Sequence, residues 1–294
     1  MRKKTDIAQF HLHKDEPQKL QFQVHSLNAY LLKNTKHTLK PHVHSYYQII
    51  WFKKGYGKHF VDFKAYDIQP NSVFFISKNQ IHYFDSYSMY EGLLVHFNQD
   101  FLLDSENSTD ILLKYNIFNN LDKDPFFIIP DDSVGKLDHL IGEFEREILA
   151  VDKFAHKEYL QYLLKLFLIS IQRLENIKPS NIAATNNQNH VVALKFKQIL
   201  EINFKQLHTV QQYADLLNVS AKTLTNYTNS TFIKSPLKII SERITLEAKR
   251  LLWHSDSSIN EISFQLGFDD PSYFVKFFKK QTEMLPKQFR SSIS

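Results

Sequence analysis

The sequence contains no cysteine and little glycine, and both absences narrow what the protein can do. Without cysteine, disulfide scaffolds, cysteine-ligated zinc or iron–sulfur centres and thiol catalysis are excluded. Six glycines are present, and neither of the glycine-rich phosphate-binding patterns, GxGxxG and GxxxxGK, occurs. No nucleophile elbow of the form GxSxG and no other catalytic constellation is found. We therefore do not expect an enzyme.

Long hydrophobic segments are lacking as well. The most apolar run, residues 162–171, includes Lys165 and is too short to cross a bilayer. The charged start, MRKKTD, leads into no apolar segment, so no secretory signal is expected. These observations predict a cytoplasmic protein without a membrane partner.

The formal net charge of +5 is concentrated in the C-terminal third of the chain. Residues 1–190 hold 22 basic and 22 acidic side chains, whereas residues 191–294 hold 14 basic and 9 acidic ones. A neutral body followed by a basic segment indicates that the C-terminal segment binds a polyanion. The length of 294 residues allows two domains.

The N-terminal part reads as short strands separated by turn signals such as Lys54-Gly55-Tyr56-Gly57 and Pro70-Asn71-Ser72. This pattern predicts a β-barrel over about residues 20–98. Strands are expected at residues 20–24, 29–32, 46–52, 59–63, 73–76, 82–84 and 93–97.

Helical periodicity replaces the strand pattern over about residues 101–175. Residues 134–148 are apolar at three- and four-residue steps, which predicts an amphipathic helix. Residues 154–174 are apolar almost all round, so this helix should be buried on more than one side. It packs either against its own barrel or against a second copy in a homodimer. The polar, asparagine-rich residues 176–190 are expected to link domains at 1–175 and 191–294.

The C-terminal segment is helical and internally duplicated. The sequence VQQYADLL at residues 210–217 matches INEISFQL at residues 259–266, and further apolar positions match about fifty residues apart. Each copy has the pattern of a helix-turn-helix unit, at about residues 209–232 and 258–281. A long helix over residues 237–253 is expected to connect them.

Turn and cap residues recur in both copies. Asn218 and Gly267 stand at the turns, and both residue types tolerate a left-handed backbone. Ser220 and Asp270 are expected to cap the second helices, with Pro271 at the first helical position of the second copy.

The second helix of each copy is expected to expose short polar side chains and lysines while turning Leu224, Tyr227, Phe274, Phe277 and Phe278 inward. Such a face suits a major groove, because asparagine and lysine can bond base edges. The expected DNA-binding residues are Lys222, Thr225, Asn226, Asn229, Ser272, Tyr273, Lys276, Lys279, Lys280 and Arg250. Phosphates are expected to be neutralised by Lys279, Lys280 and Arg250, and also by Lys249.

The C-terminal hundred residues resemble the DNA-binding domain of AraC/XylS-type transcriptional regulators. The resemblance lies in Arg243-Ile244, Ala248, Leu251-Leu252, Ile259, Ile262, Leu266-Gly267-Phe268, Ser272-Tyr273-Phe274, Phe277-Phe278-Lys279-Lys280, Pro286 and Phe289-Arg290. It implies two helix-turn-helix units that read successive major grooves, with double-stranded promoter DNA and RNA polymerase as partners and activation as the outcome. By family position, Lys222, Thr225, Asn226, Ser272, Tyr273 and Lys276 would lie near bases.

The sequence departs from the family pattern at several positions. Asn226, Thr228 and Asn229 replace an arginine and a Phe-Lys pair in the first recognition helix. Lys234 and Met284 stand where glycine usually follows each recognition helix. A left-handed conformation costs a non-glycine residue about 1 kcal/mol, so we expect these turns to be built differently.

A histidine-rich stretch marks the N-terminal part. On one strand, His42, His44, Tyr46 and Gln48 would share a face, and His82 follows after the next turns. The order resembles a cupin barrel, in which His-x-His, a glutamate and a later histidine bind a metal, but Gln48 takes the glutamate position. The resemblance to the metal-free, cupin-like sensor half of AraC-type regulators implies instead that these five residues line an effector pocket. A structural polar core and a three-histidine metal site remain alternatives.

Together these features predict an α+β multidomain protein. A cupin-like barrel with accessory helices is followed by an all-α double helix-turn-helix domain. The predicted function is a homodimeric, sequence-specific transcriptional regulator that responds to an unknown small-molecule effector without a metal or cofactor. Two alternatives remain, namely a metal-dependent cupin enzyme with a helical appendage and a constitutive DNA-binding regulator whose barrel only dimerises.

Overall fold

The computed structural model describes residues 7–85, 89–102, 118, 124–175 and 188–292. Two compact units divide the chain, one formed by Ala8–Ile182 and the other chiefly by Ala183–Ser294, and each is described by itself. Most of the predicted linker, residues 176–187, lies outside the described residues. No helix within the described ranges is long and apolar enough to span a bilayer.

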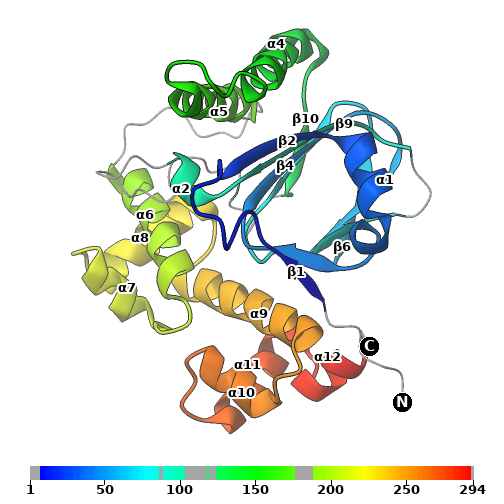
Figure 1. Ribbon diagram of the computed structural model, residues 1–294. Helices are drawn as coiled ribbons and strands as arrows, with labels where there is room; N and C mark the ends of the chain where they lie inside the picture. Colours follow the sequence, from blue (N-terminus) through cyan, green and yellow to red (C-terminus); the bar gives the residue numbers. More distant parts are fainter. Residues whose placement is uncertain (1–6, 86–88, 103–117, 119–123, 176–187, 293–294) are drawn as a thin grey trace. The chain divides into compact units, whose positions relative to one another are not determined.

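The N-terminal unit contains two five-stranded sheets (Figure 1). The first sheet has the order β1 (Ala8–Phe10), β3 (His42–His44), β8 (His82–Phe84), β5 (Gly57–Val61) and β6 (Lys64–Ile68). The second has the order β10 (Phe126–Ile128), β7 (Ser72–Ile76), β4 (Tyr47–Lys54), β9 (Glu91–Phe97) and β2 (Phe22–Ser26). Among the described strands, β1 and β3 pair in parallel and the other pairings are antiparallel.

Both faces of the second sheet are buried, and strand β4 shows how. Its residues Tyr47, Ile49 and Trp51 join one apolar cluster with α4 (Asp131–Ile148) and α5 (His156–Glu175). The intervening Ile50 and Phe52 join a second cluster with residues of the first sheet. Successive side chains of a strand point to opposite faces, so one face meets the helices and the other faces the first sheet. Helices α4 and α5 lie side by side (Figure 1).

The structure confirms the β-rich N-terminal fold but corrects one predicted strand. Residues 29–32 belong to helix α1 (Leu27–Thr38), whose Leu27 is buried in the core between the sheets. A short apolar run such as Ala-Tyr-Leu-Leu does not by itself distinguish a strand from a buried helix. The sequence also failed to indicate β1, β6 and β10, and the short helix α2 (Gln99–Leu102) was not predicted separately.

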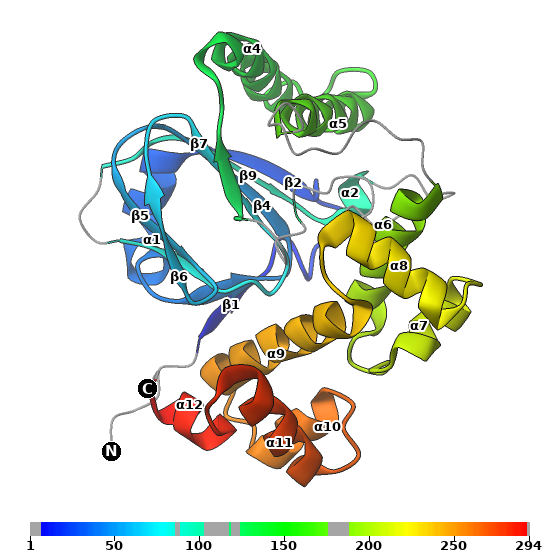
Figure 2. The ribbon, with the colours of Figure 1, turned by 180° about the vertical axis from the view of Figure 1, so that it is seen from behind.

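The C-terminal unit is entirely helical within its described residues (Figure 2). Its helices are α6 (Gln188–Asn203), α7 (Val210–Leu216), α8 (Ala221–Phe232), α9 (Pro236–His254), α10 (Ile259–Gln265), α11 (Pro271–Thr282) and α12 (Pro286–Ser292). Helices α7 and α8 form one helix-turn-helix unit and α10 and α11 form the other, with α9 between them. Both helix-turn-helix units contribute side chains to one apolar core around α9.

Local hydrogen bonds explain where these helices begin. The side chains of Ser220 and Asp270 accept hydrogen bonds from the backbone N–H groups of Thr223 and Ser272, as the sequence predicts. Helices α7 and α10 begin with capping boxes at Thr209 and Ser258, in which the third helical residue bonds back to the cap. The two helix-turn-helix units therefore share their local design.

The turns between the helices follow the prediction, and the turns after α8 and α11 are built differently from the family pattern, as expected. Asn218 and Gly267 are left-handed, with φ of 54° and 77°, as expected. After the recognition helices, the left-handed residues are Ile233 and Glu283, each one residue before the position (Lys234 or Met284) where the family pattern has glycine. The N–H groups of Ile233 and Glu283 still bond to carbonyl groups of the preceding helix, so the chain reverses at these residues.

Candidate functional site

Helix α8 presents a polar face. Lys222, Asn226 and Asn229 are exposed, whereas Leu224 is fully buried in the core of the unit. Thr225 is half-buried and its hydroxyl donates a hydrogen bond to the carbonyl oxygen of Ala221 at 2.8 Å. Three of the four predicted DNA-binding residues of this helix therefore lie free at the surface.

The inward side of α8 differs from the expectation at one residue. Tyr227 was expected to face inward but is only half-buried. Thr228 is fully buried and its hydroxyl donates to the carbonyl oxygen of Thr225 at 3.2 Å. A small hydroxyl residue therefore lies where the family pattern has a large side chain.

Helix α11 presents a basic face. Ser272, Lys276, Lys279 and Lys280 are exposed, and Tyr273 is 63% exposed. Phe274 and Phe278 lie on the opposite side of the helix and are fully buried, while Phe277 is half-buried. Neither α8 nor α11 contains an acidic residue, so both faces attract anions.

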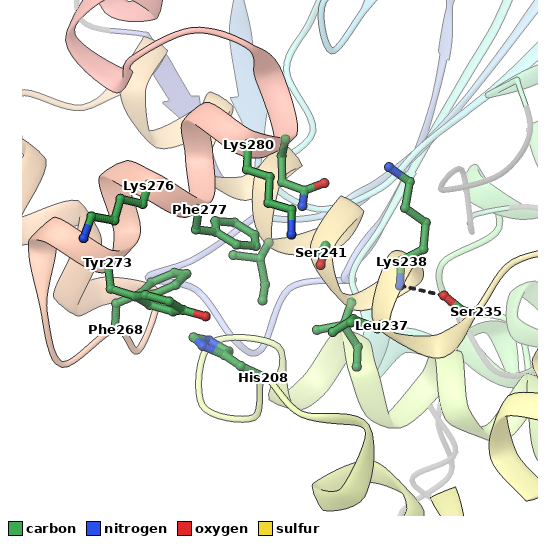
Figure 3. Close-up of a pocket in the computed structure, with 13 residues that line it drawn as sticks. His208, Ser235, Leu237, Lys238, Ser241, Phe268, Tyr273, Lys276, Phe277 and Lys280 are labelled. Atoms are coloured by element: carbon green, nitrogen blue, oxygen red, sulfur yellow. Dashed lines mark hydrogen bonds between the residues drawn. The ribbon is translucent and has the colours of Figure 1, made fainter. Parts of the chain in front are cut away.

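An open cavity of about 600 Å³ lies beside α11 within the C-terminal unit (Figure 3). Tyr273, Lys276 and Lys280 line it together with Lys238 of α9 and His208, which precedes α7. Neither Lys238 nor His208 was predicted to belong to the site. In the sequence, Lys238 looks like an ordinary solvated lysine on the connecting helix, so nothing indicated that it lies beside α11. Lys238 therefore adds a fourth lysine beside the three exposed lysines of α11.

The structure contradicts the expectation that Arg250 contacts phosphate. Its side chain is only 6% exposed, and its Nη1 atom lies 3.7 Å from a carboxylate oxygen of Glu247. Arg243 also binds this carboxylate, with 3.1 Å between the nearest atoms, and pairs with Glu201 at 2.8 Å. Arg250 therefore belongs to a buried ion-pair network of α9 rather than to the surface.

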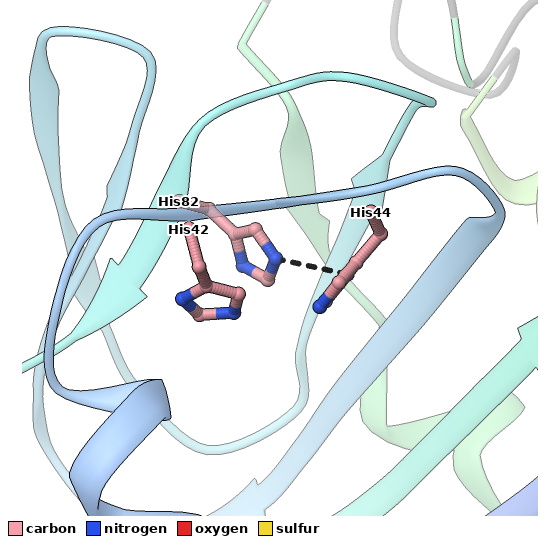
Figure 4. A group of neighbouring side chains, drawn as sticks. All are labelled: His42, His44 and His82. Atoms are coloured by element: carbon pink, nitrogen blue, oxygen red, sulfur yellow. Dashed lines mark hydrogen bonds between the residues drawn. The ribbon is translucent and has the colours of Figure 1, made fainter. Parts of the chain in front are cut away.

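A buried histidine cluster lies between the sheets of the N-terminal unit (Figure 4). His42 and His44 come from β3, and His82 of β8 is the direct cross-strand partner of His42. The ring centroid of His82 lies 4.3 Å from that of His42 and 4.8 Å from that of His44. The three residues are each at most 2% exposed, and each can direct one nitrogen into a group whose atoms lie within 4.8 Å of one another.

The predicted single strand around these histidines is in fact two strands. His42 and His44 lie on β3 of the first sheet, whereas Gln48 lies on β4 of the second sheet. Tyr46 falls between the strands and stacks on His44 with ring centroids 4.5 Å apart. The five predicted effector residues are nevertheless all buried in the same unit.

Two further buried histidines, His59 and His96, belong to the cluster and were missed from the sequence. Nδ1 of His82 lies 3.4 Å from Nε2 of His59, and Nε2 of Gln48 lies 3.0 Å from Nε2 of His96. Both residues interrupt apolar strands at inward positions, which is the signal that could have found them. Around these groups, three buried atoms have no hydrogen-bond partner among the described residues: His44 Nε2, Gln48 Oε1 and His59 Nδ1.

Burial governs the protonation of this cluster. It lowers the pKa of His42 to about 4 and the pKa values of His59 and His96 to about 3. Burial also lowers the pKa values of His44 and His82 well below the usual value, with neighbouring histidines adding to the shift. These imidazoles are therefore neutral near pH 7, and each offers a lone pair to a ligand or a metal ion.

Comparisons with known proteins agree on both units. One family model, described as an AraC-like ligand binding domain, matches residues 26–164, and another, described as a helix-turn-helix domain, matches residues 213–292. The chain is 23% identical over 256 residues to the HTH-type transcriptional activator RhaS of Mannheimia succiniciproducens, covering 85% of this chain and 88% of that protein. It is 22% identical over 266 residues to RhaS of Escherichia fergusonii, covering 85% and 86%.

Among solved structures, the chain matches that of ToxT from Vibrio cholerae with a bound unsaturated fatty acid. It is 18% identical to this chain, with a TM-score of 0.39, and the match covers 92% of this chain and 94% of that one.

Proposed function

This chain belongs to the AraC family of DNA-binding transcriptional regulators, and on that premise we propose that α8 and α11 bind promoter DNA while the N-terminal barrel binds a small-molecule effector. The relatives are named transcriptional activators, so we propose that this chain also activates, through contact with RNA polymerase. The proposed site of action is the cytoplasm.

One observation supports DNA binding above all others. Two helix-turn-helix units of matching local design each expose a recognition helix that is free of acidic residues. Asn226 of α8 and Lys276 of α11 occupy corresponding outward faces, where asparagine can bond adenine and lysine can bond guanine. Lys279 and Lys280 are proposed to neutralise phosphates, which raises affinity without selecting sequence. Lys222, Thr225, Asn229, Ser272 and Tyr273 complete the proposed interface.

The experiment uses the full-length chain and DNA recovered by selection from a random pool. Fluorescence anisotropy compares wild type with the double variant Asn226→Ala, Lys276→Ala. We expect affinity to fall at least about tenfold, since each good base contact contributes about 1–3 kcal/mol. Lys136→Ala, which removes an exposed lysine on α4, serves as the control and should leave affinity unchanged.

Two results would refute this assignment of the interface. One is an affinity that does not change with salt concentration, because phosphate contacts release counterions. The other is a double variant that binds the selected DNA as tightly as the control.

The barrel and its helices support the remaining parts of the proposal. His42, His44, Tyr46, Gln48 and His82 are the proposed effector-binding residues, because they supply the polar groups between the sheets. A thermal shift of the barrel or a change in DNA affinity upon addition of a small molecule tests this role.

Helix α5 is the proposed dimer contact. One side of it is buried under the second sheet, including Leu164 and Phe167, while Tyr162 and Leu166 on the other side are 67% and 47% exposed. A second copy of the chain would cover this apolar side. Sedimentation velocity of wild type against Leu166→Glu tests the dimer, and a monomeric wild type would refute it.

A further inference from the structure

An open basic cavity in the N-terminal unit is lined by residues outside the histidine cluster. Its volume is about 630 Å³, and none of the five proposed effector-binding residues lines it. We propose that this cavity is a second ligand site, which binds a small organic anion carrying more than one negative charge, as carboxylates or as phosphates. The inference goes beyond the proposed function and does not depend on DNA binding.

Strand pairing brings distant parts of the chain to this cavity. Phe97, at the end of β9, pairs with Phe22 at the start of β2 and with Tyr47 at the start of β4. The residues just beyond these strand ends therefore meet at one end of the second sheet. The cavity is lined there by Gln21, Asn98 and Ser45, by residues of the segment 12–20, by α2 and by the first turn of α5.

Four lysines from separate segments surround the cavity. Lys14 and Lys19 precede β2, Lys78 follows β7 and Lys157 lies in the first turn of α5. Lys19 is paired with Glu16 at 2.8 Å, and Asp100 is the one carboxylate among the described residues that line the cavity. Within the described part of the chain, the ammonium groups of Lys14 and Lys157 take part in no ion pair or hydrogen bond. Like charges around one cavity repel each other, so an anion placed between them is stabilised.

Lys78 is positioned at the edge of the cavity by two neighbours. It is half-buried, its Nζ atom donates a hydrogen bond to Oε1 of Gln99 at 3.1 Å, and the same atom lies 5.2 Å from the ring centroid of Tyr47. These contacts restrict the side chain before a ligand arrives. Less conformational entropy is therefore lost when an anion binds to this lysine.

Side-chain amides fix the wall of the cavity that carries Lys14. Nδ2 of Asn98 donates to the carbonyl oxygen of Leu12 at 3.1 Å. Nε2 of Gln21 donates to the carbonyl oxygen of Lys19 at 3.0 Å. The segment is therefore tied to the end of the second sheet, and the cavity is formed in advance. A preformed cavity of this size suits a metabolite.

The chemistry of the lining favours a multiply charged ligand. Ammonium groups on separate segments can each bind a carboxylate or phosphate oxygen of one molecule, and such charge-assisted bonds are strong. A singly charged ion would engage fewer lysines and would be held less tightly against screening by salt. Gln18 and Ser45 supply neutral hydrogen-bonding groups for the rest of the ligand.

The test measures anion binding by the full-length chain. Citrate and pyrophosphate are the probes, one for carboxylates and one for phosphates, and acetate at equal ionic strength represents a single charge. Isothermal titration calorimetry compares wild type with the double variant Lys14→Met, Lys157→Met, which loses two charges. We expect affinity for at least one of the two polyanions to fall about tenfold or more. The matched control Lys64→Met, Lys136→Met removes two exposed lysines of the same unit outside the cavity and should bind as wild type does.

Lysine acetylation followed by mass spectrometry locates the bound anion, because the C-terminal unit also exposes lysines. In wild type, citrate or pyrophosphate should slow the acetylation of Lys78 and Lys157 and leave that of Lys64 unchanged. Protection by one probe alone would assign the ligand to carboxylates or to phosphates. Circular dichroism establishes that the double variant is folded, and the wild-type protection experiment stays decisive if it is not.

Three results would overturn the proposal. The first is that neither polyanion protects Lys157. The second is that acetate protects this lysine as well as the polyanions do. The third is that the folded double variant binds both polyanions as tightly as the control.

Discussion

Replacing Gly267 by alanine should destabilise the C-terminal unit more than a left-handed backbone alone can explain. Gly267 lies in the turn between α10 and α11 with φ of 77°. A Cβ atom added there would lie 1.9 Å from the carbonyl oxygen of Lys205 in the segment that precedes α7. The next residue, Phe268, packs on His208 of that segment with ring centroids 4.7 Å apart. The turn of the second helix-turn-helix unit is therefore packed directly against the segment that connects α6 and α7.

Two costs add in the Gly267→Ala variant. A left-handed alanine costs about 1–2 kcal/mol. Relief of the backbone clash requires the two segments to separate, and overpacking of this kind costs about 1–3 kcal/mol. The free energy of unfolding should therefore fall by about 2–5 kcal/mol. The matched control is Asn218→Ala in the first copy, where φ is 54° but a Cβ atom is already present, so its cost should not exceed about 1 kcal/mol.

Tryptophan fluorescence during urea unfolding can follow this unit alone. The chain has two tryptophans, Trp51 in the barrel and Trp253 in α9. In a Trp51→Phe background, Trp253 reports on the C-terminal unit. Equal losses of stability in Gly267→Ala and Asn218→Ala would refute the reasoning, because they would mean that the contact with Lys205 contributes nothing.

Four further outcomes follow from the DNA-binding unit. Lys279→Ala should reduce the slope of log K for DNA binding against log salt concentration by about 0.9, as measured by fluorescence anisotropy. Arg250→Ala should leave that slope unchanged and should instead lower the free energy of unfolding, as measured by urea unfolding. Arg243→Met removes the ion pairs of Arg243 with Glu201 and Glu247 and should cost about 3–5 kcal/mol; an undisturbed unfolding midpoint would contradict the network. Burial would raise the pKa of Glu247, but Arg243 and Arg250 outweigh the effect of burial and hold this pKa below its usual value. The stabilisation that the ionised Glu247 provides is therefore complete above the usual carboxyl pKa and is lost as the pH falls through the lowered pKa of Glu247. Acid titration followed by Trp253 fluorescence measures this loss of stability. Ser258→Ala removes the cap of α10 and should cost about 1 kcal/mol in urea unfolding followed by Trp253 fluorescence, and an unchanged unfolding midpoint would contradict the role of the cap.

The C-terminal unit could be predicted well because its signals are local. Turn residues such as Asn218 and Gly267 and caps such as Ser220 and Asp270 act within a few residues of their own position. The duplication reinforced them, since each copy supported the interpretation of the other. The outward faces of α8 and α11 followed from helical periodicity alone, with Tyr227 the residue that periodicity described least well.

The N-terminal unit was harder, because its strands pair with distant partners. A short apolar segment at residues 29–32 gave no local sign that it would be helical. The break between β3 and β4 was equally invisible, although it places His44 and Gln48 on different sheets. His59 and His96 look like isolated polar residues until the sheets bring them to His82 and Gln48.

By itself, the sequence determined the two-part architecture, the paired helix-turn-helix units and the polar faces that they expose, because periodicity, caps and charge act along the chain. Only the tertiary structure decided which charged and polar groups are accessible. It buries Arg250 beside Glu247, seats Gly267 on the backbone of Lys205 and gathers histidines from both sheets. Burial and contact between distant segments depend on how elements pack, and packing has no periodic signature in the sequence.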